Sequence, residues 1–449
     1  MQIRLSSYGQ ASTHPSPVSR LLAEFAHDFR DGVDVNLGVG YVNEETIPVP
    51  EFLEALQAVG RDGAKYRQAF NYGSPVGSKN LIESIRRFLT TMKIGQLDEA
   101  TIASKRLAIG ACGATSILDG LAQVLAPGIV VTSDPTYYIY ADVLERKGFE
   151  ILPVPEDAEG MDVKLLERKL RAMGSAAEQI SFFYVVTVNN PSGTILSNRR
   201  RRELFEVVAR ESRRQKRLIP IFYDLAYELL LHDPEAEPFA SALPYDDLGI
   251  VYEIATLSKI LAPGLRIGYL LGPNSPFMHA MIEKTSDSGF SAPLFVQEMA
   301  SYLLDNCMQE QLRAVNAAYR EKALAVKAGI QRSLGPFLQE QRGGSAGFYY
   351  YLTFRDIETH PTSPLFRFLT RTTGDAAVDG SKENRLPRVI YIPGEYCVHR
   401  RGDLAEVGKR QLRVSYGFED APQILRALEL MREGVEFVHR TATLVGSAR

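Results

Sequence analysis

The sequence predicts a two-domain α/β protein whose larger domain contains a mainly parallel sheet. Short segments rich in β-branched and aromatic residues alternate with helical segments through the centre of the chain. Most of these short segments are apolar on both faces, which is typical of strands that helices cover on either side. The chain has 449 residues, more than one hydrophobic core usually holds, and this indicates two domains.

The expected elements of the larger domain follow one another from residue 114 to residue 271. The expected strands are 129–132, 149–154, 180–188, 218–223, 249–255 and 267–271. The expected helices are 114–125, 137–147, 163–173 and 199–216. Such alternation of strands and helices favours parallel strands joined by helical crossovers.

The pattern changes after about residue 295. Long helices are expected over 294–333, strand patterns follow at 347–354, 389–392 and 411–416, and a last helix begins at Ala421. These elements predict a smaller α+β domain, in which the polar stretch 371–388 is expected to form a mobile loop. Residues 1–20, which Pro15 and Pro17 interrupt, are expected to form a loosely held arm.

Charge and composition exclude several classes of partner. Lys and Arg number 51 against 54 Asp and Glu, so the chain has no excess positive charge to attract nucleic acid or an acidic membrane. No apolar leader or run of about 18 apolar residues is present. The three cysteines lack the CxxC spacing of metal sites and fit a reducing compartment. We therefore expect a soluble, cytoplasmic protein without a bound metal.

One arginine-rich segment, 198–217, is the only feature that suggests a nucleic-acid surface. Its apolar residues recur at helical spacing, at Leu204, Phe205, Val207 and Val208. This spacing favours an amphipathic helix whose arginines form a solvated face.

A lysine and an arginine follow one of the expected strands. Lys259 comes directly after Thr256-Leu-Ser, and Arg266 lies seven residues further on. Burial at a strand end lowers the pKa of a lysine, which suits an amine that forms a Schiff base. A guanidinium in a fixed position suits a phosphate dianion. Taken alone, the pair is as well explained by a surface lysine and a structural arginine.

Polar residues also end two other expected strands, where functional groups gather in open α/β sheets. Asp224 and Tyr227 follow strand 218–223, and Asn190 follows strand 180–188. The aspartate can pair with a protonated ring nitrogen, and the tyrosine can donate to a phenolate oxygen. Asp224 is equally suited to cap a short helix. The Asn-Pro and Ser-Gly pairs around Asn190 form a turn, within which its amide can donate to a ligand oxygen.

Two further positions suit anions. Gly113, Ala114 and Thr115 precede an apolar helix, and small residues at a helix N-terminus let a phosphate approach the backbone N–H groups. An ordinary helix start explains them as well. Arg413 lies inside an expected strand, where a buried guanidinium needs either a structural carboxylate or the carboxylate of a substrate.

Taken in order, the motifs resemble the class I/II aminotransferases of fold type I, which use pyridoxal 5'-phosphate (PLP). The motifs are GAT, PTYYIY, NNPSG, DLAY, TLSK, LRIG and LRVSYG. The resemblance covers nearly the whole chain, from the Leu37-Gly-Val-Gly40 motif to Arg413. It implies a mainly parallel seven-stranded sheet flanked by helices, and a smaller α+β domain built from both chain ends. The implied division is an arm and part of the small domain at 1–55, the large PLP-binding domain at 56–305, and the rest of the small domain at 306–449.

The resemblance also implies a role for each matching residue. Lys259 holds PLP as a Schiff base and moves a proton, Asp224 pairs with the pyridine nitrogen, and Tyr227 completes the catalytic set. The other cofactor contacts are Asn190, which with Tyr227 meets the phenolic oxygen, Tyr137 on the ring face, and Gly113, Ala114, Thr115, Thr256 and Arg266 at the phosphate. Ser258 is a rival to Thr256, but Thr256 lies three residues before the lysine, as in the family.

Gly38, Asn190 and Arg413 are implied to hold the α-carboxylate of the substrate. Tyr72, in the stretch NYGSPVG, matches a tyrosine that reaches the phosphate of the neighbouring subunit. This match implies a homodimer with active sites at the interface.

The implied reaction moves an amino group between an amino acid and a 2-oxo acid in ping-pong order. Aspartate aminotransferases bind a second carboxylate with an arginine of the partner subunit that lies a little after the lysine, whereas Lys284 is the only cation in 281–292. A dicarboxylate is therefore not expected. Four tyrosines suggest an apolar or aromatic substrate, with a place in the core as the alternative for most of them: Tyr41, Tyr138, Tyr349 and Tyr350. The stretches NYGSPVG, TLSKILAPGLRIG and SRLLAEF are also similar to valine–pyruvate aminotransferases.

Other functions of the same scaffold stay open. C–S lyases, 1-aminocyclopropane-1-carboxylate synthase-like enzymes and decarboxylases share the motifs above. Some bacterial transcription regulators join an aminotransferase-like domain to a winged-helix domain, but only 36 residues precede Leu37 and they contain no helix-turn-helix pattern. A binding protein that has lost activity is also conceivable, although all the chemical positions are intact.

Overall fold

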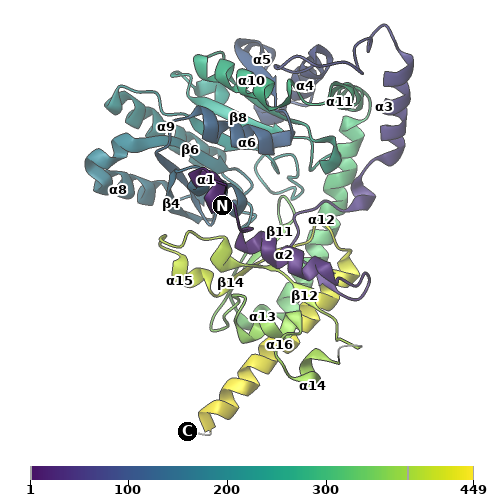
Figure 1. Ribbon diagram of the computed structural model, residues 1–449, viewed down its shortest axis with the longest axis vertical. Helices are drawn as coiled ribbons and strands as arrows, with labels where there is room; N and C mark the ends of the chain where they lie inside the picture. Colours follow the sequence, from purple (N-terminus) through teal and green to yellow (C-terminus); the bar gives the residue numbers. More distant parts are fainter. Residues whose placement is uncertain (1–2, 382–383, 448–449) are drawn as a thin grey trace.

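The computed structural model describes residues 3–381 and 384–447. It has a larger α/β part and a smaller part below it in Figure 1, with one long helix, α12 (Met308–Ser333), running from the first to the second. The expected two-part organisation agrees with this arrangement, while the boundaries 1–55, 56–305 and 306–449 stay a prediction.

The larger part is built on one sheet. Among the described residues, eight strands pair in the order β2-β9-β8-β7-β6-β3-β4-β5. Their bounds are β2 (Lys105–Ile109), β3 (Ile129–Asp134), β4 (Glu150–Asp157), β5 (Gly160–Met161), β6 (Ile180–Val186), β7 (Ile221–Asp224), β8 (Val251–Thr256) and β9 (Gly268–Pro273). Strands β4, β3, β6, β7 and β8 run parallel, and β9 pairs antiparallel with β8 and β2. The expected fold is confirmed, with the two-residue β5 added at one edge.

Helices cover both faces of this sheet. Those after the first strands are α6 (Gly113–Val124), α7 (Tyr138–Arg146), α8 (Val163–Met173), α9 (Asn198–Gln215) and α10 (Pro276–Gly289). Every residue of β3, β7 and β8 is buried as a result. The sequence analysis did not identify β2, because this strand has five residues and begins with the charged pair Lys105-Arg106.

The arginine-rich helix α9 differs in one respect from the expectation. Arg200 and Arg201 are buried, because each has carboxylates close by that compensate its charge. Arg200 pairs with Asp157 at 2.9 Å, and Arg201 lies 3.4 Å from Glu228. The helix therefore contributes a buried ion pair, Arg201–Glu228, as well as a solvated face.

The smaller part contains a four-stranded antiparallel sheet, in the order β10-β11-β14-β13 among the described residues. Its strands are β10 (Leu338–Gly343), β11 (Tyr349–Phe354), β13 (Ile392–Pro393) and β14 (Gln411–Ser415). Beside it, β1 (Val35–Asn36) pairs in parallel with β12 (Val389–Ile390), so the N-terminal segment joins the C-terminal one. The expectation that this part uses both chain ends agrees with that pairing.

The remaining helices complete the two parts. They are α1 (Ser7–Ala11), α2 (Pro17–His27), α3 (Val49–Arg61), α4 (Lys79–Thr91), α5 (Glu99–Ser104), α11 (Leu294–Asn306), α13 (Pro364–Thr370), α14 (Ala376–Asp379), α15 (Ala405–Gly408) and α16 (Ala421–Ser447). The long helical pattern 294–333 is divided at Cys307, whose backbone is not helical. In the described part of the chain, none of the helices combines the length and the apolar character needed to cross a membrane.

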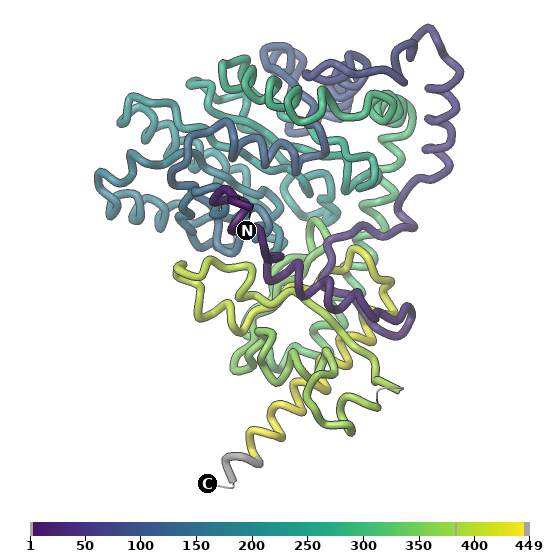
Figure 2. The backbone as a smooth tube through the Cα atoms, viewed as in Figure 1, coloured from purple at the N-terminus to yellow at the C-terminus, as the bar shows by residue number. Residues whose placement is uncertain are grey.

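The N-terminal arm is docked more firmly than its sequence suggests. The Tyr8 ring lies 5.6 Å from the Arg146 guanidinium and 5.5 Å from the Lys147 ammonium, on α7 and just after it. Helix α2 starts at Pro17 because Ser16 caps it by accepting the Ser19 N–H. Figure 2 shows the arm passing from the larger part to the smaller one. The stretch 371–388 contains α14, and residues 382 and 383 of it lie outside the described residues.

Candidate active site

A cavity of about 400 Å³ lies at the edge where β6, β7 and β8 end. Its other wall comes from α2, the loop 36–40, β11 and β14. The cavity brings together nearly all the residues predicted from the sequence, namely Gly38, Ala114, Thr115, Tyr137, Asn190, Asp224, Tyr227, Thr256, Lys259, Arg266 and Arg413. Gly113 and Tyr72 do not line it.

Lys259 reaches the cavity from the loop after β8. Its Nζ donates a hydrogen bond to the Gly40 carbonyl at 2.9 Å. Burial, together with the nearby Arg413 and Arg266, lowers the pKa of Lys259 to about 8. A substantial share of the amine is therefore neutral near physiological pH, as a nucleophile or a base requires.

Asp224 ends β7 and is buried. Its Oδ2 accepts a hydrogen bond from the Tyr184 hydroxyl at 2.7 Å, and its Oδ1 accepts one from the Ala226 N–H at 3.0 Å. Burial raises the pKa of this carboxyl, and the two hydrogen bonds oppose the rise. No Lys or Arg among the described residues forms an ion pair with Asp224, so it is suited to a cationic group of a ligand.

Sequence reasoning missed Tyr184, which lies on β6 beside Asp224. The only signal was a tyrosine within a strand whose other residues are almost all apolar. A buried Tyr hydroxyl usually needs a partner, but the sequence does not say which residue provides it.

The other end of the cavity suits a phosphate. No side chain caps α6, so its first N–H groups, near Ala114 and Thr115, lack a capping acceptor. Arg266 lies beside this helix end and donates to the Pro263 carbonyl at 3.0 Å. Gly113 permits the approach, because a Cβ there would lie 2.7 Å from Arg266 Nη2.

Both hydroxyls considered for the phosphate line the cavity. Thr256 Oγ1 donates to the Ile267 carbonyl at 2.8 Å and lies 2.9 Å from Ser258 Oγ. The two hydroxyls are thus neighbours, and the choice of Thr256 stays a prediction.

Arg413, on β14, is almost completely buried without a carboxylate partner in the described part of the chain. Its Nη1 donates to Asn190 Oδ1 at 2.7 Å, and its Nη2 donates to the Gly38 carbonyl. Because a guanidinium only donates, the Asn190 atom that faces it is the oxygen, and the amide nitrogen is free for another acceptor. Arg201, equally buried, has Glu228 for its charge. The neutral surroundings of Arg413 suit an anionic ligand.

The remaining aromatic residues differ in position. Tyr137 and Tyr138 line the cavity, and the Tyr227 and Tyr349 hydroxyls lie 2.7 Å apart in its wall. Tyr350 belongs to the core instead, where its hydroxyl donates to the Ala323 carbonyl at 2.8 Å. The sequence analysis did not identify Leu22, Val39, Ile139 or Val186 as lining residues.

Tyr72 is 78% exposed, and its ring lies 5.2 Å from that of Phe290. It does not reach the cavity of its own chain, so its predicted contact with the cofactor requires a second subunit.

These residues fit PLP. A lysine of lowered pKa suits its aldehyde, the buried Asp224 without a cation suits its ring nitrogen, and Arg266 beside the uncapped α6 suits its phosphate. The three groups line one cavity, as a single molecule with these three features requires.

Comparison with known proteins agrees with this fit. The family described as aminotransferase class I and II matches residues 33–415, and the chain belongs to this family. An uncharacterized aminotransferase of Saccharolobus solfataricus is 26% identical over 90% of this chain and 91% of that protein. An uncharacterized HTH-type transcriptional regulator of Bacillus subtilis is 24% identical over 81% of this chain and 69% of that protein.

A solved structure has the same fold. The multiple substrate aminotransferase from Thermococcus profundus superposes with a TM-score of 0.80, at 22% identity, over 97% of this chain and 98% of that one. The protein is a transaminase with PLP as its cofactor.

Proposed function

We propose that this transaminase acts on amino acids with an aliphatic or aromatic side chain, and that donor and acceptor react in ping-pong order. The observation that carries the proposal is the buried Arg413, which faces only neutral partners in the same cavity as Lys259. A guanidinium in this setting favours the α-carboxylate of an amino acid or a 2-oxo acid.

The number of cationic side chains in the cavity supports a substrate with a single carboxylate. Among the described residues that line it, the cations are Lys259, Arg266 and Arg413. The first two are proposed to hold the cofactor and the third the α-carboxylate, which leaves no lining cation of the same subunit for a second carboxylate. Lys284 lines a separate small cavity beside α6 and α10. Apolar and aromatic side chains also line the cavity, at Leu22, Val39, Tyr138 and Ile139.

The chemistry divides between cofactor and chain. PLP, when bound, supplies the carbonyl carbon that accepts the amino group and a ring that withdraws electrons from Cα of the substrate. Lys259 would hold the cofactor through Nζ and, when free, move the proton of Cα, for which its pKa of about 8 is suited. Asp224 would keep a proton on the pyridine nitrogen.

The other proposed contacts orient the reactants. Asn190 and Tyr227 would donate to the phenolic oxygen, and Tyr137 would cover the ring face. Ala114, Thr115, Thr256 and Arg266 would hold the phosphate, while Gly113 gives Arg266 room. Arg413 would hold the carboxylate with Asn190, and Gly38 orients Arg413 through its carbonyl.

We also propose a homodimer in which Tyr72 reaches the phosphate end of the partner's cavity. Phe70, Tyr72 and Phe290 are 79%, 78% and 58% exposed, and the Tyr72 and Phe290 rings lie 5.2 Å apart, so this surface carries several large apolar side chains that a partner could cover. A hollow of about 840 Å³ borders Tyr72. Light scattering should give twice the 49.9 kDa mass of one chain. The free cysteines fit a reducing compartment, and we propose a cytoplasmic location.

The test of the substrate class is half-reaction spectroscopy of the purified holoenzyme with single amino acids. Leucine, valine, phenylalanine and tyrosine should convert the cofactor absorbance faster than aspartate does. Preference for aspartate above all others would refute the proposed class. Release of ammonia in place of amino transfer would indicate a lyase of the same fold.

A further inference from the structure

We propose that Asn36, held by Glu419, is a positioning residue that sets the α-carboxylate site by shaping the loop 36–40. The inference rests on the proposed role of Arg413 as the carboxylate ligand. It concerns two residues outside the cavity, whose contacts reach it through the backbone.

The loop 36–40 supplies hydrogen-bond acceptors to two cations of the cavity. The Gly38 carbonyl accepts from Arg413 Nη2, and the Gly40 carbonyl accepts from Lys259 Nζ at 2.9 Å. The loop is closely packed, since a Cβ at Gly40 would lie 2.6 Å from the Tyr349 hydroxyl. The loop conformation therefore determines how the Arg413 guanidinium is held, whereas Lys259 Nζ would be held by the cofactor once PLP is bound.

The Asn36 side chain shapes this loop from its first residue. Its Oδ1 accepts hydrogen bonds from the N–H groups of Gly38 at 3.0 Å and Val39 at 3.2 Å. Asparagine side chains commonly fold a turn in this way. The Gly38 carbonyl and the Val39 N–H belong to the same peptide group and point in opposite directions. Because this N–H is bonded to Asn36, the carbonyl points away from Asn36, toward Arg413.

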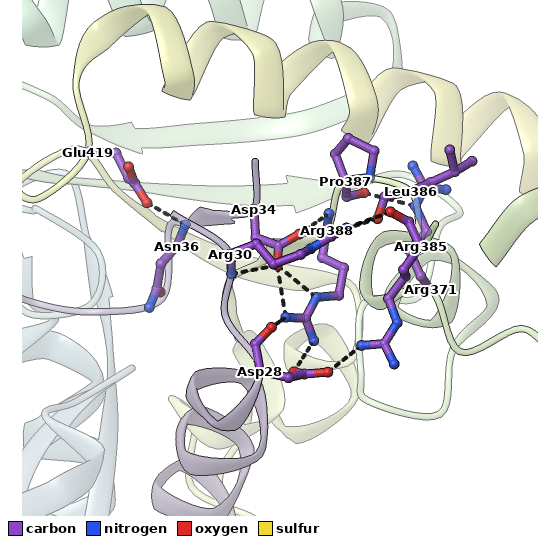
Figure 3. Close-up of polar contacts among 10 residues, drawn as sticks. All are labelled: Asp28, Arg30, Asp34, Asn36, Arg371, Arg385, Leu386, Pro387, Arg388 and Glu419. Atoms are coloured by element: carbon purple, nitrogen blue, oxygen red, sulfur yellow. Dashed lines mark hydrogen bonds and ion pairs between the residues drawn. The ribbon is translucent and has the colours of Figure 1, made fainter. Parts of the chain in front are cut away.

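Glu419 holds Asn36 in turn. The N–H groups of Val35 and Leu37 donate to the carbonyls of Arg388 and Ile390. Along a strand, alternate residues face opposite sides, so the Asn36 N–H points the other way, where it donates to Glu419 Oε1 at 2.7 Å (Figure 3). This bond and the side-chain turn make Asn36 the link between Glu419 and the loop.

Glu419 follows β14, the strand that carries Arg413. Its own carbonyl accepts from Lys322 Nζ at 2.7 Å, which anchors the turn. The Ser415 N–H donates to the Leu37 carbonyl at 2.8 Å. The loop is thus bound to β14 and the residues just after it at three points, through Arg413, Ser415 and Glu419. Asn36 joins these contacts, because its N–H is bonded to Glu419 and its side chain to the N–H of Gly38, whose carbonyl accepts from Arg413.

A neighbouring ion cluster provides a matched control. Asp28 pairs with Arg388 at 2.7 Å and with Arg385 at 2.5 Å (Figure 3). These contacts hold the N-terminal segment to β12 but do not touch the loop 36–40. Asp28→Asn therefore loosens the same segment without disturbing the Asn36 circuit.

The experiment measures binding of 3-phenylpropionate, an amino-acid analogue without the amino group, to the PLP-loaded enzyme by calorimetry. Asn36→Ala should raise its Kd, and the KM of the best amino donor, about tenfold, because two hydrogen bonds that orient the loop are lost. The kcat should change less than about threefold, since the chemical groups remain in place. The absorbance of the bound cofactor should stay unchanged.

Conservative variants should rescue the effect. Asn36→Ser can accept from the same N–H groups, and Glu419→Gln keeps its acceptor, so both should bind 3-phenylpropionate within about threefold of the wild type. Asp28→Asn should bind like the wild type. Glu419→Ala should behave like Asn36→Ala, and it takes over the test if Asn36→Ala does not fold.

Two results would overturn the inference. One is a folded Asn36→Ala enzyme whose Kd for 3-phenylpropionate stays within about twofold of the wild type. The other is an Asp28→Asn enzyme that is weakened as much as Asn36→Ala, which would indicate general loosening. If the wild type prefers aspartate, the proposed substrate class is wrong, and the same comparison with succinate tests the Asn36 role separately.

Discussion

The two walls of the cavity are built in different ways. One wall is the edge of the larger sheet, where Asp224 ends β7 and Asn190 and Lys259 lie just after β6 and β8. The other wall combines Leu22 from helix α2 with Arg413 from the C-terminal sheet. In Figure 2 these are the purple and the yellow-green parts of the tube, which meet beside the larger part.

The difference separates two tasks. Parallel strands paired residue by residue keep their carboxyl ends in a fixed relation, which suits groups that must act on the same few atoms. The second wall depends on contacts between distant segments, which suits recognition of the rest of the substrate. Substitutions in the sheet wall should therefore lower kcat, and those in the assembled wall should raise KM.

The largest effect is expected at Lys259. Lys259→Ala should lower kcat on the order of 10⁴-fold, because the base is lost, and should abolish the absorbance band of the lysine-bound cofactor. Lys164→Ala, at an exposed position of α8, should leave both unchanged. Retention of the band in Lys259→Ala would show that another residue holds the cofactor.

A smaller loss is expected at Asp224. Asp224→Asn removes the charge that favours a proton on the ring nitrogen and should lower kcat about 100-fold with little change in KM. Tyr184→Phe removes the 2.7 Å hydrogen bond to this carboxyl and should lower kcat only severalfold. Steady-state kinetics distinguishes these effects. A rise in KM without a fall in kcat would contradict the role given to Asp224 in the sheet wall.

Two buried arginines, Arg413 in the assembled wall and Arg201 in α9, should respond differently to substitution. Arg413→Lys should raise KM for amino acids about 100-fold, because one ammonium does not replace a two-pronged guanidinium. Arg201→Met leaves Glu228 buried without its partner and should instead lower the free energy of unfolding by about 3 kcal/mol, as urea titration measures. Equal effects on KM would remove the distinction between the two sites.

Among the residues that line the assembled wall, the smaller effect is expected at Leu22. Leu22→Ala shortens an apolar side chain in the assembled wall and should lower kcat/KM for leucine and phenylalanine about tenfold. Alanine as donor should be nearly unaffected, since its methyl group is short. Leu324→Ala, at a 58% exposed position of α12, is the control. A uniform loss for all donors would mean that Leu22 supports the fold and does not select substrates.

The sequence by itself was sufficient for the sheet wall. Lys259, Asp224 and Asn190 each follow an apolar segment, and the rule that parallel strands share their carboxyl edge places them together without knowledge of the fold's details. The strand patterns also predicted the parallel sheet and the change to a second architecture after residue 295. Strands and the residues at their ends can be predicted in this way because each depends on the residue types within one short stretch of chain.

Only the tertiary structure decided the rest. Leu22 reaches the cavity because α2 is docked there, and Tyr184 finds Asp224 because β6 and β7 pair in one register. Asn36 and Glu419 are separated by 383 positions. No local pattern specifies such a contact, because it depends on how two ends of the chain pack around β14. The sequence therefore identified the cofactor and the residues at the sheet edge, while the packing of distant segments determined how the proposed carboxylate site is held.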